Sequence, residues 1–213
     1  MKLFDYFRSS AAYRVRIALN LKGQTPARAF VHLRRGAQRE DDYLALNPQG
    51  LVPSLVTDAG DVLTQSLAIL EWLDETYPDP PLLPPDTLGR ARVRSLALTV
   101  ACDIHPLNNT RVLAYLTGTL GVSEEQKNGW YKYWIDTGFE ALETRLAREP
   151  STGRFCHGGT PTIADICLVP QMANARRVDF DFAPYPTLRR VEAACVALPA
   201  FANAAPAKQP DAE

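Results

Sequence analysis

The first eighty residues alternate short apolar runs, typical of strands, with longer amphipathic stretches, typical of helices. Apolar residues recur at helical spacing from about Ala11 to Lys22, where Gly23 ends the pattern, and again from Leu67 to Leu73. The same pattern predicts four short strands, over residues 2–7, 27–33, 54–57 and 62–64. Because strands alternate with helices, we predict an α/β domain built around a small sheet.

The composition changes between Tyr77 and Pro85, where five of nine residues are proline. Proline can neither continue a helix nor donate within a sheet, so we place a domain boundary there and end the first domain at residue 80. Beyond it the apolar spacing is helical throughout and predicts an all-α domain over residues 88–213. Its helices are expected at roughly 88–118, 123–148, 162–177 and 186–197. The last stretch, from Ala204 on, has little to bury, so we expect it to be loosely held.

Composition and charge narrow the classes of partner. The chain has 213 residues, of which 46% are hydrophobic, and 23 basic against 24 acidic side chains leave a formal net charge of −1. Such a chain has no global attraction for nucleic acid or for an anionic membrane. No apolar stretch has the length of a membrane span or a signal sequence. We therefore expect a cytoplasmic protein that binds neither nucleic acid nor membrane.

The spacing of cysteine and histidine argues against a metal site. The four cysteines lie far apart, form no C-x-x-C pair and are interpreted as small buried apolar residues. None of the three histidines lies three or four residues from another, so no helix can present two imidazoles to one ion. We predict that the protein binds no metal.

The junction between the first strand and the first helix is a candidate site, because Arg8, Ser9 and Ser10 lie between them. A helix start presents unpaired N–H groups and the positive end of the helix dipole, which stabilise an anion or a thiolate. The serine hydroxyls add donors at the same point. A serine before a helix is also a common N-cap, so these residues alone leave a purely structural role open.

A second helix start carries similar polar side chains, since Gln65 and Ser66 begin the helix that follows the predicted hairpin. Between the two helix starts, Pro53 follows Val52 at the beginning of a strand, which indicates either a strand edge or a cis peptide bond. Two such helix starts in one small domain predict a cleft for an extended ligand with negative groups. The capping-box pattern over Thr162–Asp165 is interpreted as structural.

These motifs together resemble the zeta class of the glutathione transferase family, and within it the bacterial isomerases of maleylpyruvate and maleylacetoacetate. The resemblance spans essentially the whole chain and rests on Ser9-Ser10, Arg14–Leu19, Leu46–Gln49, Val52-Pro53, Gln65-Ser66, Cys102–Pro106, Gly159–Asp165 and Gln209–Asp211. It implies a thioredoxin-like N-terminal domain, an all-helical C-terminal domain, a homodimer and glutathione as cofactor.

The resemblance also implies roles for single residues. Ser9 matches the serine that holds the glutathione thiolate, with Ser10 as the alternative, and its hydroxyl should lower the thiol pKa from about 8.5 toward neutrality. Val52 and a cis Pro53 would face the cysteinyl backbone. The residues that match the remaining glutathione contacts are Gln65 and Ser66 at the γ-glutamyl end, with Gln49, His105 and Asn109 as further polar contacts.

One position departs from the family pattern. Many members have a cysteine after the two serines, whereas this chain has Ala11. Alanine supplies neither a thiol nor a hydrogen bond, so any mechanism that needs a protein thiol at this site is in doubt, and the role falls to Ser9.

The implied activity is a glutathione-dependent cis–trans isomerisation of a maleyl keto acid to its fumaryl isomer in the catabolism of aromatic compounds. Addition of a thiolate gives the double bond single-bond character, and elimination after rotation regenerates glutathione. A small dicarboxylate substrate calls for cationic forks, for which Arg8, Arg111 and Arg176 are the candidates. Without the resemblance, Arg111 and Arg176 would be interpreted as solvated surface residues. Arg14 and Arg16 are expected to brace the first helix or to solvate its outer face.

Two other functions stay open at the level of sequence. One is a transferase that consumes glutathione by conjugating or dehalogenating small α-haloacids, and the other is a glutathione-binding protein without catalysis. The serine at position 9 and the three candidate arginines favour the isomerase. Maleylpyruvate and maleylacetoacetate share the maleyl ketone and differ only at the remote end, so the sequence does not separate them.

Overall fold

The computed structural model describes residues 1–213, which form two compact units. The first unit comprises Met1–Pro81 together with Ala197–Glu213, and the second comprises Leu82–Val196. The chain passes from one unit to the other within the proline-rich segment, where the Asp79–Pro80 peptide bond is cis. The second domain predicted from the sequence extends to the C-terminus, whereas the structure groups the residues from Ala197 on with the first unit.

The first unit is built on a four-stranded sheet with the strand order β2-β1-β3-β4. β1 (Lys2–Asp5) pairs in parallel with β2 (Ala27–Phe30) and antiparallel with β3 (Ser54–Val56), which pairs antiparallel with β4 (Val62–Thr64). Leu3 and Leu55, which are partners on β1 and β3, are completely buried at the centre of the sheet. This is the small-sheet α/β arrangement that the sequence predicts.

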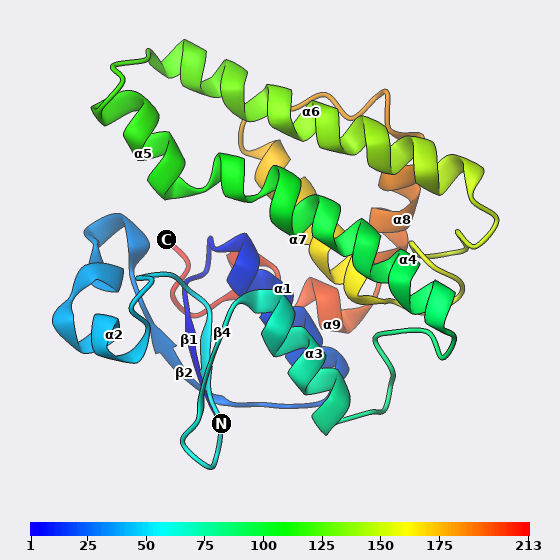
Figure 1. Ribbon diagram of the computed structural model, residues 1–213, viewed down its shortest axis with the longest axis horizontal. Coiled ribbons are helices and arrows are strands. Elements are labelled where there is room, and N and C mark those ends of the chain that lie inside the picture. The colour runs from blue at the N-terminus through cyan, green and yellow to red at the C-terminus, as the bar shows by residue number, and fades with distance from the viewer. The chain divides into compact units, whose positions relative to one another are not determined.

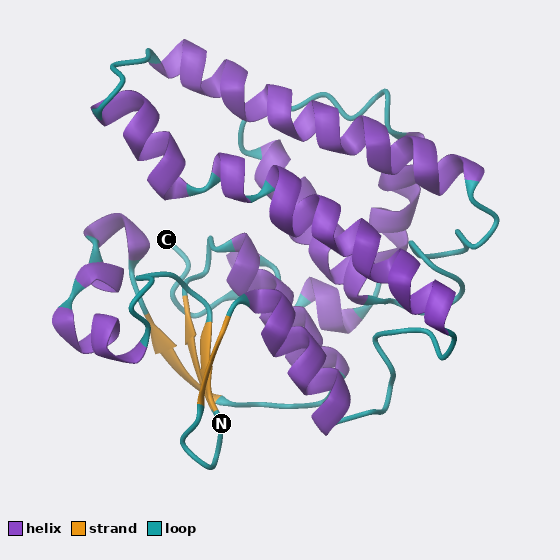
Figure 2. Cartoon of the chain, viewed as in Figure 1, coloured by secondary structure: helices purple, strands orange, loops and turns teal.

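Helices flank this sheet on both sides (Figures 1 and 2). α1 (Ser10–Leu21) and α3 (Ser66–Thr76) lie side by side, and their apolar stripes, which include Ile17, Ile69 and Leu73, are fully buried. On the other side, α2 (Asp41–Leu46) contributes Tyr43 to a second apolar cluster. The short 3₁₀ turns η1 (Leu33–Arg35) and η2 (Ala37–Arg39) precede α2.

The C-terminal segment packs on the first unit through α9 (Pro199–Ala202) and the 3₁₀ turn η5 (Pro206–Lys208). Phe201 is fully buried, the Tyr13 hydroxyl donates to its carbonyl, and Arg16 Nε donates to the Ala204 carbonyl at 2.9 Å. These contacts contradict the expectation of a loosely held tail. The reason is physical, because the segment offers few large apolar side chains but supplies carbonyl acceptors to buried polar groups.

The second unit is helical, as predicted. Its elements are α4 (Thr87–Leu98), the π-helical η3 (Thr99–Ile104), the 3₁₀ turn η4 (Pro106–Asn108), α5 (Thr110–Gly118), α6 (Glu124–Arg148), α7 (Ile163–Arg176) and α8 (Pro186–Val196). α7 is apolar nearly all round, contacts α4 and α8, and is buried from Ile163 to Met172. The predicted helix over 88–118 is interrupted, since Pro106 has no N–H to continue the hydrogen-bond ladder.

No helix in the structure combines the length and the hydrophobicity that crossing a bilayer requires.

Candidate active site

Three segments with predicted site residues meet at one end of the sheet in the first unit. Phe4, Ser54 and Thr64 form a row across β1, β3 and β4. From that row the chain leaves β1 toward the first helix start, enters β3 from the Val52–Pro53 bond and leaves β4 toward the second helix start. The Val52–Pro53 bond is cis, as the resemblance implies, and both residues are buried.

Ser9 is the N-cap of α1. Its backbone is extended, and its Oγ accepts a hydrogen bond from the Ala12 N–H at 3.2 Å. A hydroxyl that accepts in this way keeps its own proton, so Ser9 can still donate to an anion at the helix start. Ser9 is half-buried, whereas Ser10 is buried in the first turn of the helix. Ser9 therefore presents the more accessible hydroxyl.

The backbone that leads to Ser9 is held from two sides. Buried Arg16 donates from Nη2 to the Phe7 carbonyl at 3.1 Å and from Nη1 to Asp5 at 2.7 Å. From the C-terminal segment, Asp211 Oδ2 accepts the Phe7 N–H at 2.9 Å. Burial lowers the pKa of Arg16, and the neighbouring Asp5 carboxylate opposes that shift. The expectation that Arg16 could solvate the outer face of the helix is wrong.

Arg8 lies in the same loop and is partly exposed. Burial raises the pKa of the Tyr6 hydroxyl, and Arg8 is the strongest of the charges that oppose this rise. The structure therefore puts the positive charge of Arg8 at the end of β1, directly before Ser9.

At the second helix start, Gln65 and Gln49 come together although sixteen positions separate them. Gln65 Nε2 donates to Gln49 Oε1 at 2.8 Å, and both residues are exposed. Gln65 has a positive φ of 65°, a conformation that is uncommon for a residue with a side chain and that recurs at active sites. The structure thus groups two of the residues predicted to contact the cofactor.

Ser66, the first residue of α3, is buried and accepts a hydrogen bond from Arg14 Nη1 at 3.2 Å. Arg14 is itself only 2% exposed, so it does not solvate the face of α1. Sequence reasoning missed this contact, because the two residues lie 52 positions apart and no local pattern links them.

A buried polar cluster fixes the turn before the cis bond. Tyr43 Oη donates to the Leu51 carbonyl at 2.6 Å, and Asn47 Nδ2 donates to the same carbonyl at 2.8 Å. Ser54 Oγ lies within hydrogen-bond distance of both side chains. Asn47 and Tyr43 therefore hold the segment that carries Val52, a role that the sequence analysis did not assign to them.

The remaining predicted residues belong to the second unit. His105 links η3 to η4, and Asn109 caps α5 by accepting the Arg111 N–H at its Oδ1, 3.1 Å away. Arg111 is exposed in the first turn of α5. These three residues thus occupy one short stretch of the chain in which α5 begins.

Gly138 of α6 permits a close approach to η3, since a Cβ there would lie 2.3 Å from the Ile104 side chain.

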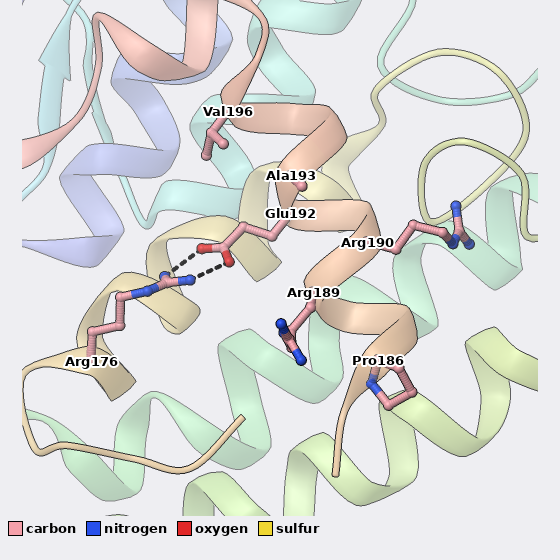
Figure 3. Close-up of a pocket in the computed structure, with 7 residues that line it drawn as sticks. All are labelled: Arg176, Pro186, Arg189, Arg190, Glu192, Ala193 and Val196. Carbon is pink, nitrogen blue, oxygen red and sulfur yellow. Dashed lines mark hydrogen bonds and ion pairs between the residues drawn. The ribbon is translucent and has the colours of Figure 1, made fainter. Parts of the chain in front are cut away.

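Arg176, at the end of α7, lies beside a surface depression of about 660 Å³ formed with α8. Figure 3 shows its guanidinium facing Glu192, with which it forms a two-pronged ion pair. The Glu192 side chain is 9% exposed, whereas the Arg176 side chain is 51% exposed. Arg189 and Arg190 of α8 also line the depression. Arg176 is therefore anchored by one carboxylate and open to solvent.

No group of three or more histidine, cysteine, aspartate or glutamate side chains is arranged to hold a metal ion. Cys156 and Cys195 are buried beside Asp165, and burial together with that carboxylate raises the pKa of both thiols.

Comparison with known proteins identifies the family. Residues 8–76 match the glutathione S-transferase N-terminal domain, and residues 134–202 match the glutathione S-transferase C-terminal domain. The chain is 54% identical to maleylpyruvate isomerase from Ralstonia sp over 211 residues, which cover 99% of each chain. It is 52% identical to the holo structure of a bacterial maleylpyruvate isomerase of the zeta class, with full coverage of both chains and a TM-score of 0.97. A maleylacetoacetate isomerase from Methylobacterium extorquens AM1, solved with malonate and glutathione, is 46% identical with the same coverage and a TM-score of 0.97.

The chain therefore belongs to the glutathione S-transferase family. The predicted membership of its zeta class and the predicted fold, a thioredoxin-like domain followed by a helical domain, are confirmed. So are the predictions of an enzyme and of glutathione as its cofactor.

Proposed function

We propose that the protein is a glutathione-dependent isomerase that converts a maleyl keto acid, maleylpyruvate or maleylacetoacetate, to its fumaryl isomer in the catabolism of aromatic compounds. The observation that carries the proposal is the meeting of two helix starts and the Val52–Pro53 bond at one end of the sheet. The chain is 54% identical to a maleylpyruvate isomerase over 211 residues, which supports the same activity.

The donors at that end of the sheet fit an extended anionic tripeptide. At the start of α1, the Ser9 hydroxyl and the positive end of the helix dipole suit the thiolate. At the start of α3, Ser66 and the N–H groups of that helix suit the carboxylate at the γ-glutamyl end, beside the Gln49–Gln65 pair. The Val52 backbone precedes the paired residues of β3, so it is available for the cysteinyl peptide group.

Glutathione bound there supplies a thiolate that adds reversibly to the maleyl double bond and thereby permits rotation about it. Ser9 favours the thiolate by donating a hydrogen bond to the charged sulfur, which lowers the thiol pKa. This arrangement has no need of a protein thiol at Ala11. Ser10 is the alternative donor if Ser9 serves only as the cap.

Arginine side chains suit the carboxylates of the substrate, because the guanidinium fork matches a carboxylate in two-point geometry. Arg8 directly precedes Ser9, so we assign it to the carboxylate nearest the reacting double bond. Arg111 and Arg176 of the second unit are proposed for the remaining negative charge. The Arg176 side chain is 51% exposed, so its positive charge is accessible to a substrate carboxylate although its Nη1 and Nη2 atoms pair with Glu192. The binding of malonate with glutathione by the Methylobacterium isomerase supports a small dicarboxylate.

We further propose that the enzyme is a cytoplasmic homodimer and that His105 and Asn109 complete the polar contacts to glutathione. The homodimer and the two contacts rest on the resemblance to the zeta class, and the cytoplasmic location rests on the absence of a long apolar stretch in the sequence.

The two substrates can be separated by a direct assay. We expect loss of the cis keto-enol absorbance of maleylpyruvate and of maleylacetoacetate only when glutathione is present, and the larger kcat/KM identifies the preferred substrate. An enzyme that turns over neither keto acid but consumes glutathione on an α-haloacid would be a conjugating transferase. Binding of glutathione without any turnover would identify a non-catalytic binding protein.

A further inference from the structure

Arg14 is a buried cation whose protein partners do not match its charge. The residue is 2% exposed, and its Nη1 donates to the neutral Ser66 hydroxyl at 3.2 Å. Its Nε and Nη2 atoms have no hydrogen-bond partner. Burying a charge in this way is unfavourable unless an opposite charge compensates for it. The buried charge of Arg14 therefore contributes little to the stability of the ligand-free protein.

Arg16 shows that the same helix can satisfy a buried arginine completely. It is 3% exposed, it pairs with Asp5 at 2.7 Å, and it donates to the carbonyls of Phe7 and Ala204. Arg14, one half-turn earlier, has no such set of acceptors. The difference indicates that the compensating charge for Arg14 comes from outside the chain.

The contact with Ser66 shows where that charge would lie. A serine hydroxyl has one proton and two lone pairs, and the Arg14 guanidinium occupies one lone pair. The proton of Ser66 is therefore directed away from Arg14 and is available to an acceptor at the start of α3. The N–H groups of the first turn of α3 and its helix dipole favour a negative acceptor at the same point.

We propose that Arg14 is a positioning residue for the α-carboxylate at the γ-glutamyl end of glutathione. It holds Ser66 as a hydrogen-bond donor and supplies the buried positive charge that the carboxylate neutralises, without touching the ligand itself. This inference rests on the proposed binding of the γ-glutamyl end of glutathione at Ser66.

The test compares two ligands on variants of the full-length protein. Glutathione and 4-aminobutanoyl-cysteinylglycine differ only in the α-carboxylate, so the ratio of their dissociation constants, measured by titration calorimetry, isolates that group. We expect the wild type to prefer glutathione by about tenfold or more, which is typical of a charge-assisted hydrogen bond. In Arg14→Met this preference should largely vanish, because the Kd of glutathione rises while the Kd of the analogue stays constant.

A second variant and a matched control guard against effects on folding. Arg14→Gln removes the charge but keeps an amide donor, so its preference should lie between those of the wild type and Arg14→Met. The melting temperature of ligand-free Arg14→Met should not fall, because the substitution removes an uncompensated buried charge. Arg16→Lys, which weakens a fully satisfied site, should lower the melting temperature and leave the ligand preference unchanged.

Three outcomes would overturn the inference in distinguishable ways. If both Arg14 variants retain the wild-type preference for glutathione, Ser66 contacts the α-carboxylate without help from Arg14. An equal rise of both dissociation constants with a lower melting temperature would make Arg14 a structural residue only. If the wild type shows no preference for glutathione over the analogue, glutathione does not bind with its α-carboxylate at Ser66, and this inference fails as well.

Discussion

At the residue scale, Ser9 combines a structural contact with a proposed chemical one. Its Oγ caps α1 by accepting the Ala12 N–H, and its proton is available to a thiolate. Ser9→Ala should reduce kcat about 10- to 100-fold, since a hydrogen bond to a charged group contributes about 1.5–3 kcal/mol. Steady-state kinetics with saturating glutathione measure this effect. Ala11→Cys should stay active, because the proposed site needs no group at that position.

Loss of the cap itself must be separated from loss of the thiolate contact. Ser123 caps α6 by accepting the Gln126 N–H, so Ser123→Ala removes a comparable cap in the second unit. Each serine substitution should cost about 1 kcal/mol of unfolding free energy, but only Ser9→Ala should slow catalysis. Wild-type kcat in Ser9→Ala together with an inactive Ser10→Ala would transfer the role to Ser10.

Arg176 poses a similar question, because its guanidinium already pairs with Glu192. Arg176→Ala should raise KM for the keto acid about tenfold, on a scale of ~1.4 kcal/mol per decade, and leave glutathione affinity unchanged. Arg176→Lys should lie in between, because lysine keeps the charge but loses the planar fork. Glu192→Gln is the matched control for the ion pair. If it raises KM as much as Arg176→Ala does, Arg176 acts through the α7–α8 packing and Arg111 becomes the better candidate.

At the scale of elements, the C-terminal segment fixes the loop that leads into the site. Asp211→Ala removes the acceptor of the Phe7 N–H, two residues before Ser9. An unsatisfied, partly buried N–H typically costs about 1–3 kcal/mol, so the melting temperature and kcat should both fall. Thermal unfolding and steady-state kinetics measure the two effects, and deletion of exposed Glu213 alone serves as the control that should change neither much. Unchanged kcat in Asp211→Ala would show that the segment stabilises the fold without positioning Ser9.

The elements that could be predicted from the sequence are those stabilised by burial of apolar residues that recur at regular spacing within one segment. α1 followed from its apolar spacing up to Gly23, and the domain boundary followed from the prolines before Leu82. The break between α4 and α5 was missed, because apolar residues continue at helical spacing through η3. The docking of the tail was missed for a different reason, since carbonyl groups such as that of Ala204 leave no trace in a hydropathy pattern.

The features of the candidate site also fall into two groups, those set by the local sequence and those set by contacts between distant segments. The position of Ser9 and Gln65 at helix starts could be predicted from the local sequence, and the cis Pro53 from its match to a family motif, whereas their roles toward glutathione stay predictions. The Arg14–Ser66 contact and the Arg176–Glu192 pair join separate helices. Only the packing of those helices determines such partners, so reasoning from one sequence could not reach them.

At the scale of the whole molecule, the proposed homodimer makes a simple prediction. Sedimentation at micromolar concentration should give twice the 23.6 kDa of the chain. If the active species sediments at the mass of one chain at every concentration tested, the enzyme is a monomer and the proposed homodimer is wrong.

The proposed isomerase regenerates glutathione in each turnover. The most direct test is the amount of fumaryl product formed per glutathione, with maleylpyruvate or maleylacetoacetate in about hundredfold excess and the thiol titrated at the end. We expect complete conversion of the better substrate, with all of the glutathione recovered as free thiol. Conversion that stops after one equivalent, with loss of the free thiol, would contradict it and identify a transferase that consumes glutathione.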